Sequence, residues 1–345
     1  MEQPPEDPLL VMLVVAVFFA SVATWFALLA RWRRGEPFLD YEPRRPVPWG
    51  APFAMLAVAF VAIALLSPQG VDAATPPEGP NPLEISQRLV GFIALQCVVI
   101  GCVLVLVAVI YRPTLRDLGL PVYADELVRD VRIGIVACLA AIAPVYGVQR
   151  LMLYVFGPSE HPLVKMVTGG EPNVGLLFLA SIAAVVIAPV SEEVFFRLLL
   201  QGWLEKWEDR RSRWHGEPLP ALVASDALPE LPADGENDEA RMTNDEEQAV
   251  SDSSFVIRHS SFPDPPPRGL VGLPHGWQPI LISSLLFALA HFGYGPDPIA
   301  IFFLALILGY VYQRTHRIVP CMVAHALFNS LAMLILWRGV FVNLE

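Results

Sequence analysis

The chain has 345 residues, 54% of them hydrophobic, and a formal net charge of −11. Apolar runs of roughly 20 residues recur along it, each long enough to cross a hydrocarbon core about 30 Å thick, which argues against a soluble protein of two domains. The acidic residues gather in the N-terminal tail and one polar insertion, and no large basic patch indicates nucleic acid as a partner. Because backbone groups inside lipid must bond within their own segment, the fold class is predicted to be an all-α polytopic membrane helix bundle of about eight transmembrane helices.

Residues 1–111 are predicted to form an N-terminal group of transmembrane helices, with spans at 9–30, 52–66 and 89–111. The first span is too long for the apolar core of a cleaved signal peptide, so we expect it to be retained. Five arginines between Arg31 and Arg45 follow it and form the densest positive cluster of any short loop. By the positive-inside rule this loop is cytoplasmic, which places the N-terminus outside.

The region 112–207 is predicted to form the first part of a catalytic membrane core. It opens on a positive turn that contains Asp117-Leu118-Gly119-Leu120 and is expected on the cytoplasmic side. A fourth span is predicted at 131–156, and a fifth begins near residue 173.

The fifth span carries a cluster of charged residues, Glu192, Glu193 and Arg197, between apolar runs. A charge inside a membrane helix costs roughly 2.5–3.5 kcal/mol on insertion scales, so the cluster requires an explanation. Glu193 and Arg197 are four residues apart and can pair on one helical face, whereas Glu192 points about 100° away. Pro189 cannot donate a backbone hydrogen bond, which predicts a kink just before the cluster.

Beyond this span the composition changes to a Pro-, Ser- and acid-rich segment, 208–275, which is predicted to be a disordered acidic cytoplasmic insertion. Residues 276–338 then complete the membrane core, with three further spans at 279–292, 298–312 and 318–337. The turn between the last two spans is positive and therefore cytoplasmic. A topology of eight spans with both termini outside is consistent with the charge of every loop.

Most cysteines and histidines in the chain suggest no chemistry. The cysteines lie in or beside apolar runs and are predicted to be small buried apolar residues: Cys97, Cys102, Cys138 and Cys321. Five of the seven histidines are expected in loops or at interfaces, where a polar side chain needs no special explanation: His161, His215, His259, His275 and His316.

The other two histidines, His291 and His325, lie on apolar helices. His291 closes a run that begins at Phe287, and His325 shares a helical face with Asn329. Taken singly, such a histidine or asparagine is often an interhelical hydrogen-bonding group, and Glu193 with Arg197 is equally compatible with a structural ion pair. Three late helices carry these groups, however, and the first four spans carry none comparable.

Two carboxylates, two imidazoles and an amide that converge in a low-dielectric cavity would form a water-activating site. Glu192 can act as a general base if burial and a neighbouring imidazole tune its pKa. Asn329 and one histidine can donate to a developing oxyanion. Two histidines and one glutamate are also the ligand set of many hydrolytic zinc sites, so Glu192, His291 and His325 would be the ligands if the reaction needs zinc. The sequence lacks Gly-x-Ser-x-Gly and an obvious nucleophilic cysteine, which leaves covalent catalysis unsupported, and it lacks His-Glu-x-x-His, which leaves the commonest metalloprotease arrangement unsupported.

Three motifs occur in a fixed order on late helices: Glu192-Glu193-x-x-x-Arg197, Phe287-x-x-x-His291 and His325-x-x-x-Asn329. Together they resemble the CPBP family of intramembrane proteases, which includes the CAAX prenyl endoproteases, and the resemblance covers roughly residues 117–337. It implies a site open toward the cytoplasm in which Glu192 polarises the attacking water with His291. It also implies that His325 and Asn329 stabilise the oxyanion, while Glu193 and Arg197 orient the site.

The family has been described both as metal-dependent and as metal-free, so the resemblance leaves zinc open. The chain departs from compact members in its long insertion and its extended N-terminal helices, which puts the substrate in question. The sequence thus predicts a multi-pass cell-membrane endopeptidase that cleaves a membrane-anchored, CAAX-like peptide or protein substrate. One alternative is a noncatalytic scaffold or a bacteriocin-immunity-type protein. Another is a proton-coupled transporter, although the paired inverted repeats expected of one are not evident.

Overall fold

The computed structural model describes residues 8–66, 82–157, 173–214, 275–292 and 297–342, and within these ranges the secondary structure is entirely helical. The helices, with two stretches of π-helix between them, follow in this order: α1 Pro8–Arg33, α2 Ala51–Leu66, α3 Pro82–Tyr111, α4 Ala124–Phe156, α6 Val174–Ile182, π-helix Ala183–Ile187, α7 Ala188–Glu193, π-helix Val194–Gln201, α8 Gly202–Trp214, α9 Gln278–Leu289, α10 Asp297–Thr315 and α11 Ile318–Val342. The protein is an all-α polytopic helix bundle, which confirms the predicted fold class.

Six of the described helical segments are long and apolar enough to cross a membrane: Pro8–Arg33, Leu83–Tyr111, Ala124–Phe156, Val174–Arg211, Asp297–Thr315 and Ile318–Arg338. The second and sixth predicted spans correspond to shorter apolar helices, Ala51–Leu66 and Gln278–Leu289. At 1.5 Å per residue, the 12 residues of α9 extend only about 18 Å, so α9 does not cross a full hydrocarbon core. Each of the eight predicted spans thus corresponds to a helical segment, but two of them are short.

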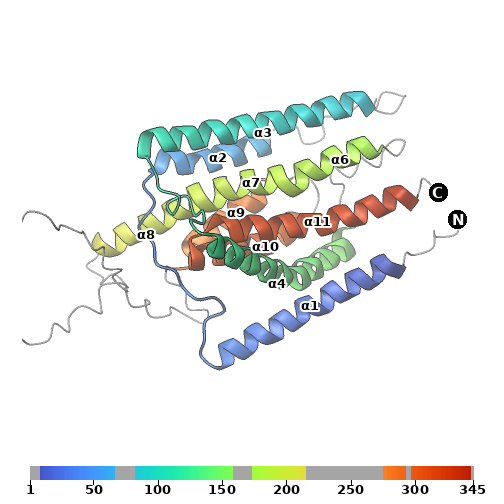
Figure 1. Ribbon diagram of the computed structural model, residues 1–345, viewed down its shortest axis with the longest axis horizontal. Helices are drawn as coiled ribbons and strands as arrows, with labels where there is room; N and C mark the ends of the chain where they lie inside the picture. The colour runs from blue at the N-terminus through green and yellow to red at the C-terminus, as the bar shows by residue number, and fades with distance from the viewer. Residues whose placement is uncertain (1–7, 67–81, 158–172, 215–274, 293–296, 343–345) are drawn as a thin grey trace, which may run out of the picture.

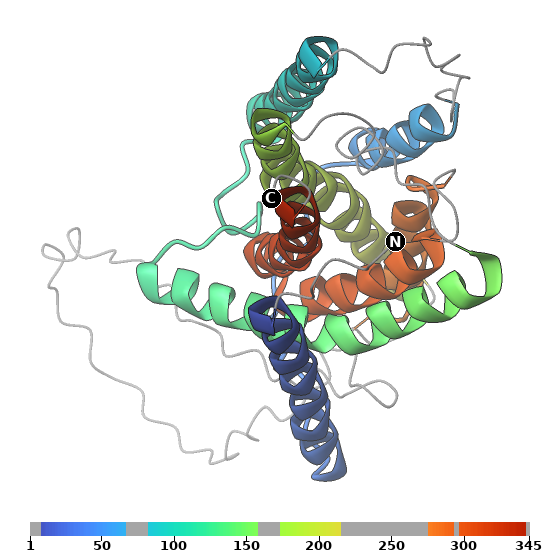
Figure 2. The ribbon, with the colours of Figure 1, turned by 90° about the vertical axis from the view of Figure 1, so that its right-hand side faces the viewer.

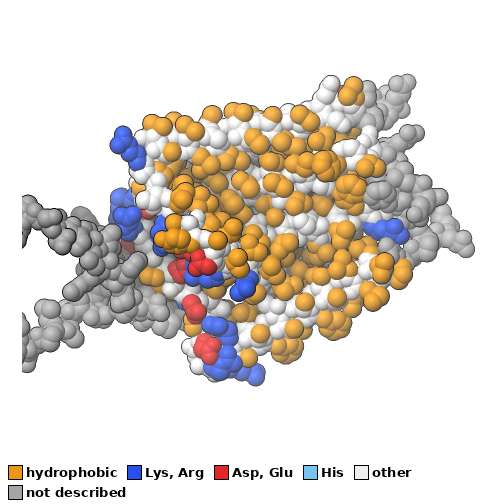
Figure 3. Space-filling model, viewed as in Figure 1, with side chains coloured by type: hydrophobic (Ala, Val, Ile, Leu, Met, Phe, Trp, Pro, Cys, Tyr) orange, Lys and Arg blue, Asp and Glu red, His pale blue; other side chains and the backbone are white. Residues whose placement is uncertain are grey.

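Helices α1, α3, the rod from α6 to α8 and α11 run roughly along one axis, whereas α4 lies across the bundle (Figures 1 and 2), and the beginning of α1 and the end of α11 lie at the same end. The end of α8 lies at the opposite end. Seen end-on, α11 and the rod formed by α6 to α8 occupy the middle, while α3 and α1 lie at opposite margins (Figure 2). Apolar side chains cover much of the visible surface, and most of the charged ones gather at the α8 end (Figure 3). Such a surface is what a lipid environment requires.

Helix α1 is held to the bundle by polar contacts at a proline of α4. Pro144 has no N–H, so the Ala140 carbonyl four residues earlier loses its helical donor. Trp25 Nε1 of α1 donates to this carbonyl at 2.9 Å, and Ala143 N–H donates to Ser21 Oγ of α1 at 3.0 Å. Groups released by the proline therefore bind a neighbouring helix, as they must where no water is available.

Two glycines allow α11 to pack closely against earlier segments. A Cβ atom on Gly134 of α4 would lie 2.7 Å from Val323, so α4 and α11 approach too closely there for any side chain. Gly119, in the predicted turn 117–120, has a φ of +66°, and its carbonyl accepts a hydrogen bond from Ile318 N–H at the start of α11. The turn therefore sits directly against the junction of α10 and α11.

The structure corrects the prediction for two cysteines. Cys138 and Cys321 are buried as expected, but Cys97 and Cys102 are exposed on α3. Because α3 lies at the margin of the bundle, it buries one stripe and turns the rest of its surface outward. Helix α8 also continues past residue 207 to Trp214, so the first residues assigned to the insertion are helical. The prediction of disorder for 215–274 lies outside the described residues.

Candidate functional site

The central rod from α6 to α8 changes its hydrogen-bond register just before Pro189. In the π-helix Ala183–Ile187, Ala188 N–H bonds to the Ala183 carbonyl five residues back. In that register the donor for the Ala184 carbonyl would be residue 189, which is proline and has no N–H. Asn329 Nδ2 of α11 donates to this carbonyl at 2.8 Å. The disturbance expected at Pro189 is therefore a set of wide turns within a continuous rod, and a side chain from α11 satisfies the carbonyl.

The predicted ion pair between Glu193 and Arg197 is present and completely buried, with Arg197 Nε 3.1 Å from Glu193 Oε2. Arg197 also donates to Ser283 Oγ of α9 at 2.8 Å, and its guanidinium lies 5.2 Å from the ring centroid of Phe287. The other oxygen of Glu193 lies 3.0 Å from His325 Nδ1. Arg197, Glu193 and His325 thus form one chain of buried polar contacts that joins the rod to α9 and α11.

Glu192 lies between the two predicted histidines. Its Oε1 is 3.9 Å from His291 Nε2, and its Oε2 is 3.9 Å from His325 Nε2. Oε2 is buried and has no hydrogen-bond partner among the described residues. Both imidazoles use Nδ1 elsewhere, His291 toward the Phe287 carbonyl at 2.9 Å and His325 toward Glu193. Both Nε2 atoms are consequently left to face the carboxylate.

Contacts of 3.9 Å are too long for direct hydrogen bonds but suit a bridging water. A water bound between Glu192 and an imidazole would have a base beside it in a partly closed site, since the Glu192 side chain is 12% exposed and that of His291 22%. Such a water is positioned for activation by general-base catalysis.

The same three residues fit a zinc ion in chemistry better than in spacing. Each imidazole has its remote nitrogen bonded to an oxygen, as metal-ligating histidines usually do. In a tetrahedral zinc site, however, neighbouring ligand atoms are roughly 3.3 Å apart. Here each imidazole lies 3.9 Å from a different oxygen of Glu192, and the three residues do not bring one ligand atom each within 4.8 Å of one another.

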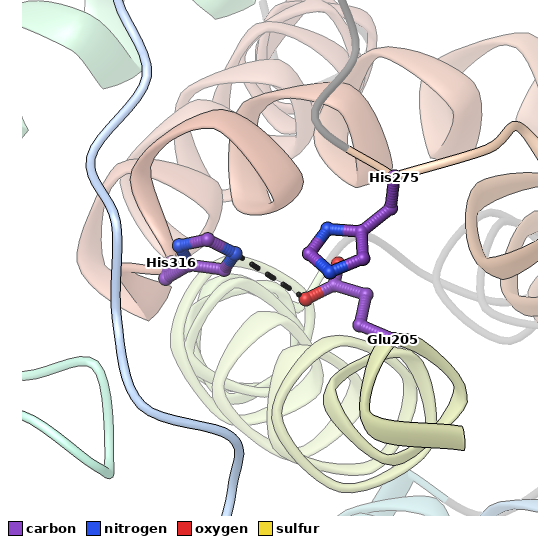
Figure 4. A group of neighbouring side chains, drawn as sticks. All are labelled: Glu205, His275 and His316. Carbon is purple, nitrogen blue, oxygen red and sulfur yellow. Dashed lines mark ion pairs between the residues drawn. The ribbon is translucent and has the colours of Figure 1, made fainter. Parts of the chain in front are cut away.

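A second polar cluster lies at the α8 end of the bundle, and the sequence analysis missed it. Glu205 of α8, His275 just before α9 and His316 between α10 and α11 point toward one another (Figure 4). Their candidate ligand atoms all lie within 4.8 Å of one another. His275 and His316 lie in connections between helices, as predicted, but both belong to this cluster, which the sequence analysis did not anticipate. His161, His215 and His259 lie outside the described residues.

The surroundings of the cluster carry both signs of charge. Glu205 accepts from Arg44 Nη2 at 3.3 Å and from Gln201 Nε2 at 3.1 Å. Burial disfavours the charged form of His275, but the carboxylates around it, chiefly that of Asp209, outweigh burial and raise its pKa above the ordinary value. Burial together with Arg44 lowers the pKa of His316.

Little in the sequence could have revealed this cluster. Glu205 is the first charged residue after the 192–197 motif, but Lys206, Glu208 and Asp209 follow it closely, so it does not stand out. His275 and His316 come from separate connections, and no spacing links them to Glu205. Only the packing of three connections at one end of the bundle brings them together.

Comparison with known proteins identifies the part of the chain that carries the candidate site. A family model described as Type II CAAX prenyl endopeptidase Rce1-like matches residues 174–228 and 267–331. The matched residues, 174–228 and 267–331, support a place in the CPBP/CAAX protease family. The match contains all three predicted motifs, and the resemblance stated from the sequence is confirmed. No curated protein and no solved structure matches the chain.

Proposed function

We propose that the protein is an intramembrane endopeptidase that hydrolyses a peptide bond of a membrane-anchored peptide or protein, with CAAX-like segments as the substrate class. The observation that carries the proposal is the arrangement around Glu192. Two imidazoles from different helices have their Nδ1 atoms bonded elsewhere and direct Nε2 toward the same carboxylate. A structural network would gain nothing from an unpartnered buried carboxylate oxygen.

In the proposed reaction, Glu192 removes a proton from a water held between it and His291. The water oxygen attacks the peptide carbonyl carbon, and the carbonyl oxygen becomes an oxyanion. His325, protonated at both nitrogens beside Glu193, donates from Nε2 to that oxyanion, and Asn329 contributes the amide N–H that is not bonded to Ala184. The C–N bond then breaks, and Glu192 returns the proton to the leaving amine.

Glu193 and Arg197 act through His325 in this proposal. Arg197 holds Glu193, and Glu193 holds His325 Nδ1, so the imidazole keeps one orientation. If the enzyme uses zinc, Glu192, His291 and His325 would hold the ion, which would lower the pKa of a bound water and polarise the carbonyl.

We further propose that both termini are outside and that the active site opens toward the cytoplasm. Glu192 lies 18 residues after Val174, the first residue of α6, so it is roughly 27 Å along the rod, toward the end where the charged side chains gather. A reporter fused after residue 345 should therefore be active outside the cell, and a cytoplasmic signal would contradict this orientation.

Replacing Glu192 by Gln tests the catalytic proposal directly. In purified protein incubated with a fluorogenic prenylated CAAX peptide in lipid, kcat should fall about 10²- to 10⁴-fold, the usual contribution of a general base. The matched control is Glu84→Gln, the same chemical change at an exposed residue of α3 that pairs with Arg88 on its own helix. Cleavage by Glu192→Gln at the rate of Glu84→Gln would overturn the proposal.

A noncatalytic scaffold is the second candidate function. It is favoured by the bond from Asn329 to the Ala184 carbonyl and by the buried pair of Glu193 with Arg197, since both contribute to helix packing in any case. If the protein is a scaffold, the wild type cleaves no peptide, and the Glu192→Gln variant still binds the partner.

A further inference from the structure

The Glu205, His275 and His316 cluster is separate from the candidate catalytic residues. Glu205 follows Glu193 by 12 positions on the same rod, which puts it roughly 18 Å further toward the α8 end. We infer that Glu205, His275 and His316 form a structural metal site that takes a divalent cation of the zinc class. None of the three residues contributes to the proposed hydrolysis, so the site is an addition to it.

The orientation of both imidazoles is the first argument for a metal. His316 Nδ1 lies 2.7 Å from the Glu42 carbonyl and therefore donates its hydrogen there, which leaves the lone pair on Nε2 facing Glu205. His275 Nε2 lies 2.9 Å from Asp209 Oδ1, while His275 Nδ1 is buried without a partner among the described residues. In each ring one nitrogen is hydrogen-bonded to an oxygen and the other can coordinate a metal, which is the usual arrangement of a metal-bound histidine.

The spacing of the ligand atoms is the second argument. His316 Nε2 is 3.4 Å from Glu205 Oε2, which is long for a charge-assisted hydrogen bond but close to the roughly 3.3 Å edge of a tetrahedral zinc site. The candidate trio at Glu192 has 3.9 Å contacts instead. Among the described residues, the Glu205 cluster brings its three ligand atoms within 4.8 Å of one another, and the Glu192 trio does not.

The charge balance around the cluster also favours a cation. The carboxylates of Glu205, Glu208 and Asp209 all act on His275, whereas Arg44 is the cation that contacts Glu205 directly. These carboxylates outnumber the guanidinium that contacts Glu205, so the local charge favours a bound cation.

The backbone at His316 is the third observation. Its φ is +49°, in the left-handed region that favours glycine over residues with a Cβ. The conformation is strained for a residue with a Cβ, and it directs the imidazole into the cluster. Strain of this kind persists where the side chain serves a purpose at the site.

Two nitrogens and a carboxylate oxygen determine the class of metal. Imidazole ligands suit zinc, cobalt and nickel, whereas magnesium and calcium prefer oxygen alone. A bound ion would join α8, the residue before α9 and the turn before α11, which are otherwise linked here by side-chain contacts. It would thereby fix the connection that leads into the helix carrying His325 and Asn329.

Metal analysis of the full-length protein in detergent tests the inference. Chelator-stripped wild type is titrated with Zn²⁺, and bound metal is counted by mass spectrometry. His316→Gly should reduce the bound metal by about one ion per chain, because glycine removes the ligand yet suits the backbone at this position. Asp209→Asn should weaken Zn²⁺ binding about 10- to 100-fold through the orientation of His275.

His291→Gln is the matched control, since it removes a histidine from the other site. It should retain the ion that His316→Gly loses, and the ion should raise its thermal unfolding temperature as it does in wild type. If wild type binds no Zn²⁺ in stoichiometric amount, or if only His291→Gln loses it, the inference is wrong. Should His316→Gly fail to fold, zinc-edge X-ray absorption of the His291→Gln variant still decides: nitrogen and oxygen ligands with imidazole scattering are expected, and a sulphur ligand or the absence of bound zinc would overturn the assignment.

Discussion

Replacing Arg197 by Met tests how strongly the buried charges of the central rod depend on one another. The guanidinium and the Glu193 carboxylate are fully buried and 3.1 Å apart. Removing one partner of a buried pair typically costs about 3–5 kcal/mol, because the other charge is left uncompensated. We expect the lower end, about 3 kcal/mol, because His325 remains 3.0 Å from Glu193 and can hold a compensating proton. Met also keeps most of the apolar contact with Phe287.

The free energy of unfolding in mixed detergent micelles measures this loss, and a second variant identifies its cause. Glu193→Gln combined with Arg197→Met leaves no uncompensated charge, so it should recover at least about 1 kcal/mol relative to the sum of the two single changes. Peptidase activity should nevertheless stay low, because His325 has lost its carboxylate. If Arg197→Met unfolds within about 0.5 kcal/mol of wild type, the pair contributes no net stability and the reasoning fails.

Two further predictions concern helix contacts. Asn329→Ala leaves the Ala184 carbonyl unsatisfied and should lower the free energy of unfolding by about 1–3 kcal/mol. In a Pro189→Ala background residue 189 regains an N–H, so the same change should lower the free energy of unfolding by clearly less. An equal loss in both backgrounds would contradict the proposed register. Gly134→Leu inserts a side chain where a Cβ already lies 2.7 Å from Val323, and it should destabilise the protein by about 1–3 kcal/mol or more, a loss that Val323→Ala partly restores in the same unfolding assay.

Local geometry explains which parts of the site were predictable. Glu193 and Arg197 pair because residues four apart share a helical face whatever surrounds them. For the same reason the neighbouring Glu192 points to a different face of the helix from that pair. The register change before Pro189 was less predictable, because the sequence shows only that residue 189 lacks a backbone N–H. Which carbonyl is released, and that Asn329 satisfies it, depends on the position of α11.

The exposed cysteines and the Glu205 cluster are two features that the sequence patterns did not predict. Cys97 and Cys102 lie in an apolar run, and in a membrane protein an apolar side chain can contact either lipid or protein without an energetic penalty. Hydrophobicity therefore cannot separate buried from exposed positions on α3. His275 and His316 look like polar residues in connections, and their burial follows only from the packing of those connections against α8.

The sequence by itself determined the helical class, the membrane character and the order of the three motifs, because apolar length and helical periodicity act within single segments. It also determined the family resemblance, which rests on residues a few positions apart. Only the tertiary structure decided that Glu192 faces two imidazoles and that Glu205, His275 and His316 converge, since those neighbours come from segments far apart in the chain. Helix packing against particular glycines and prolines sets these distances, and that packing is a property of the whole bundle.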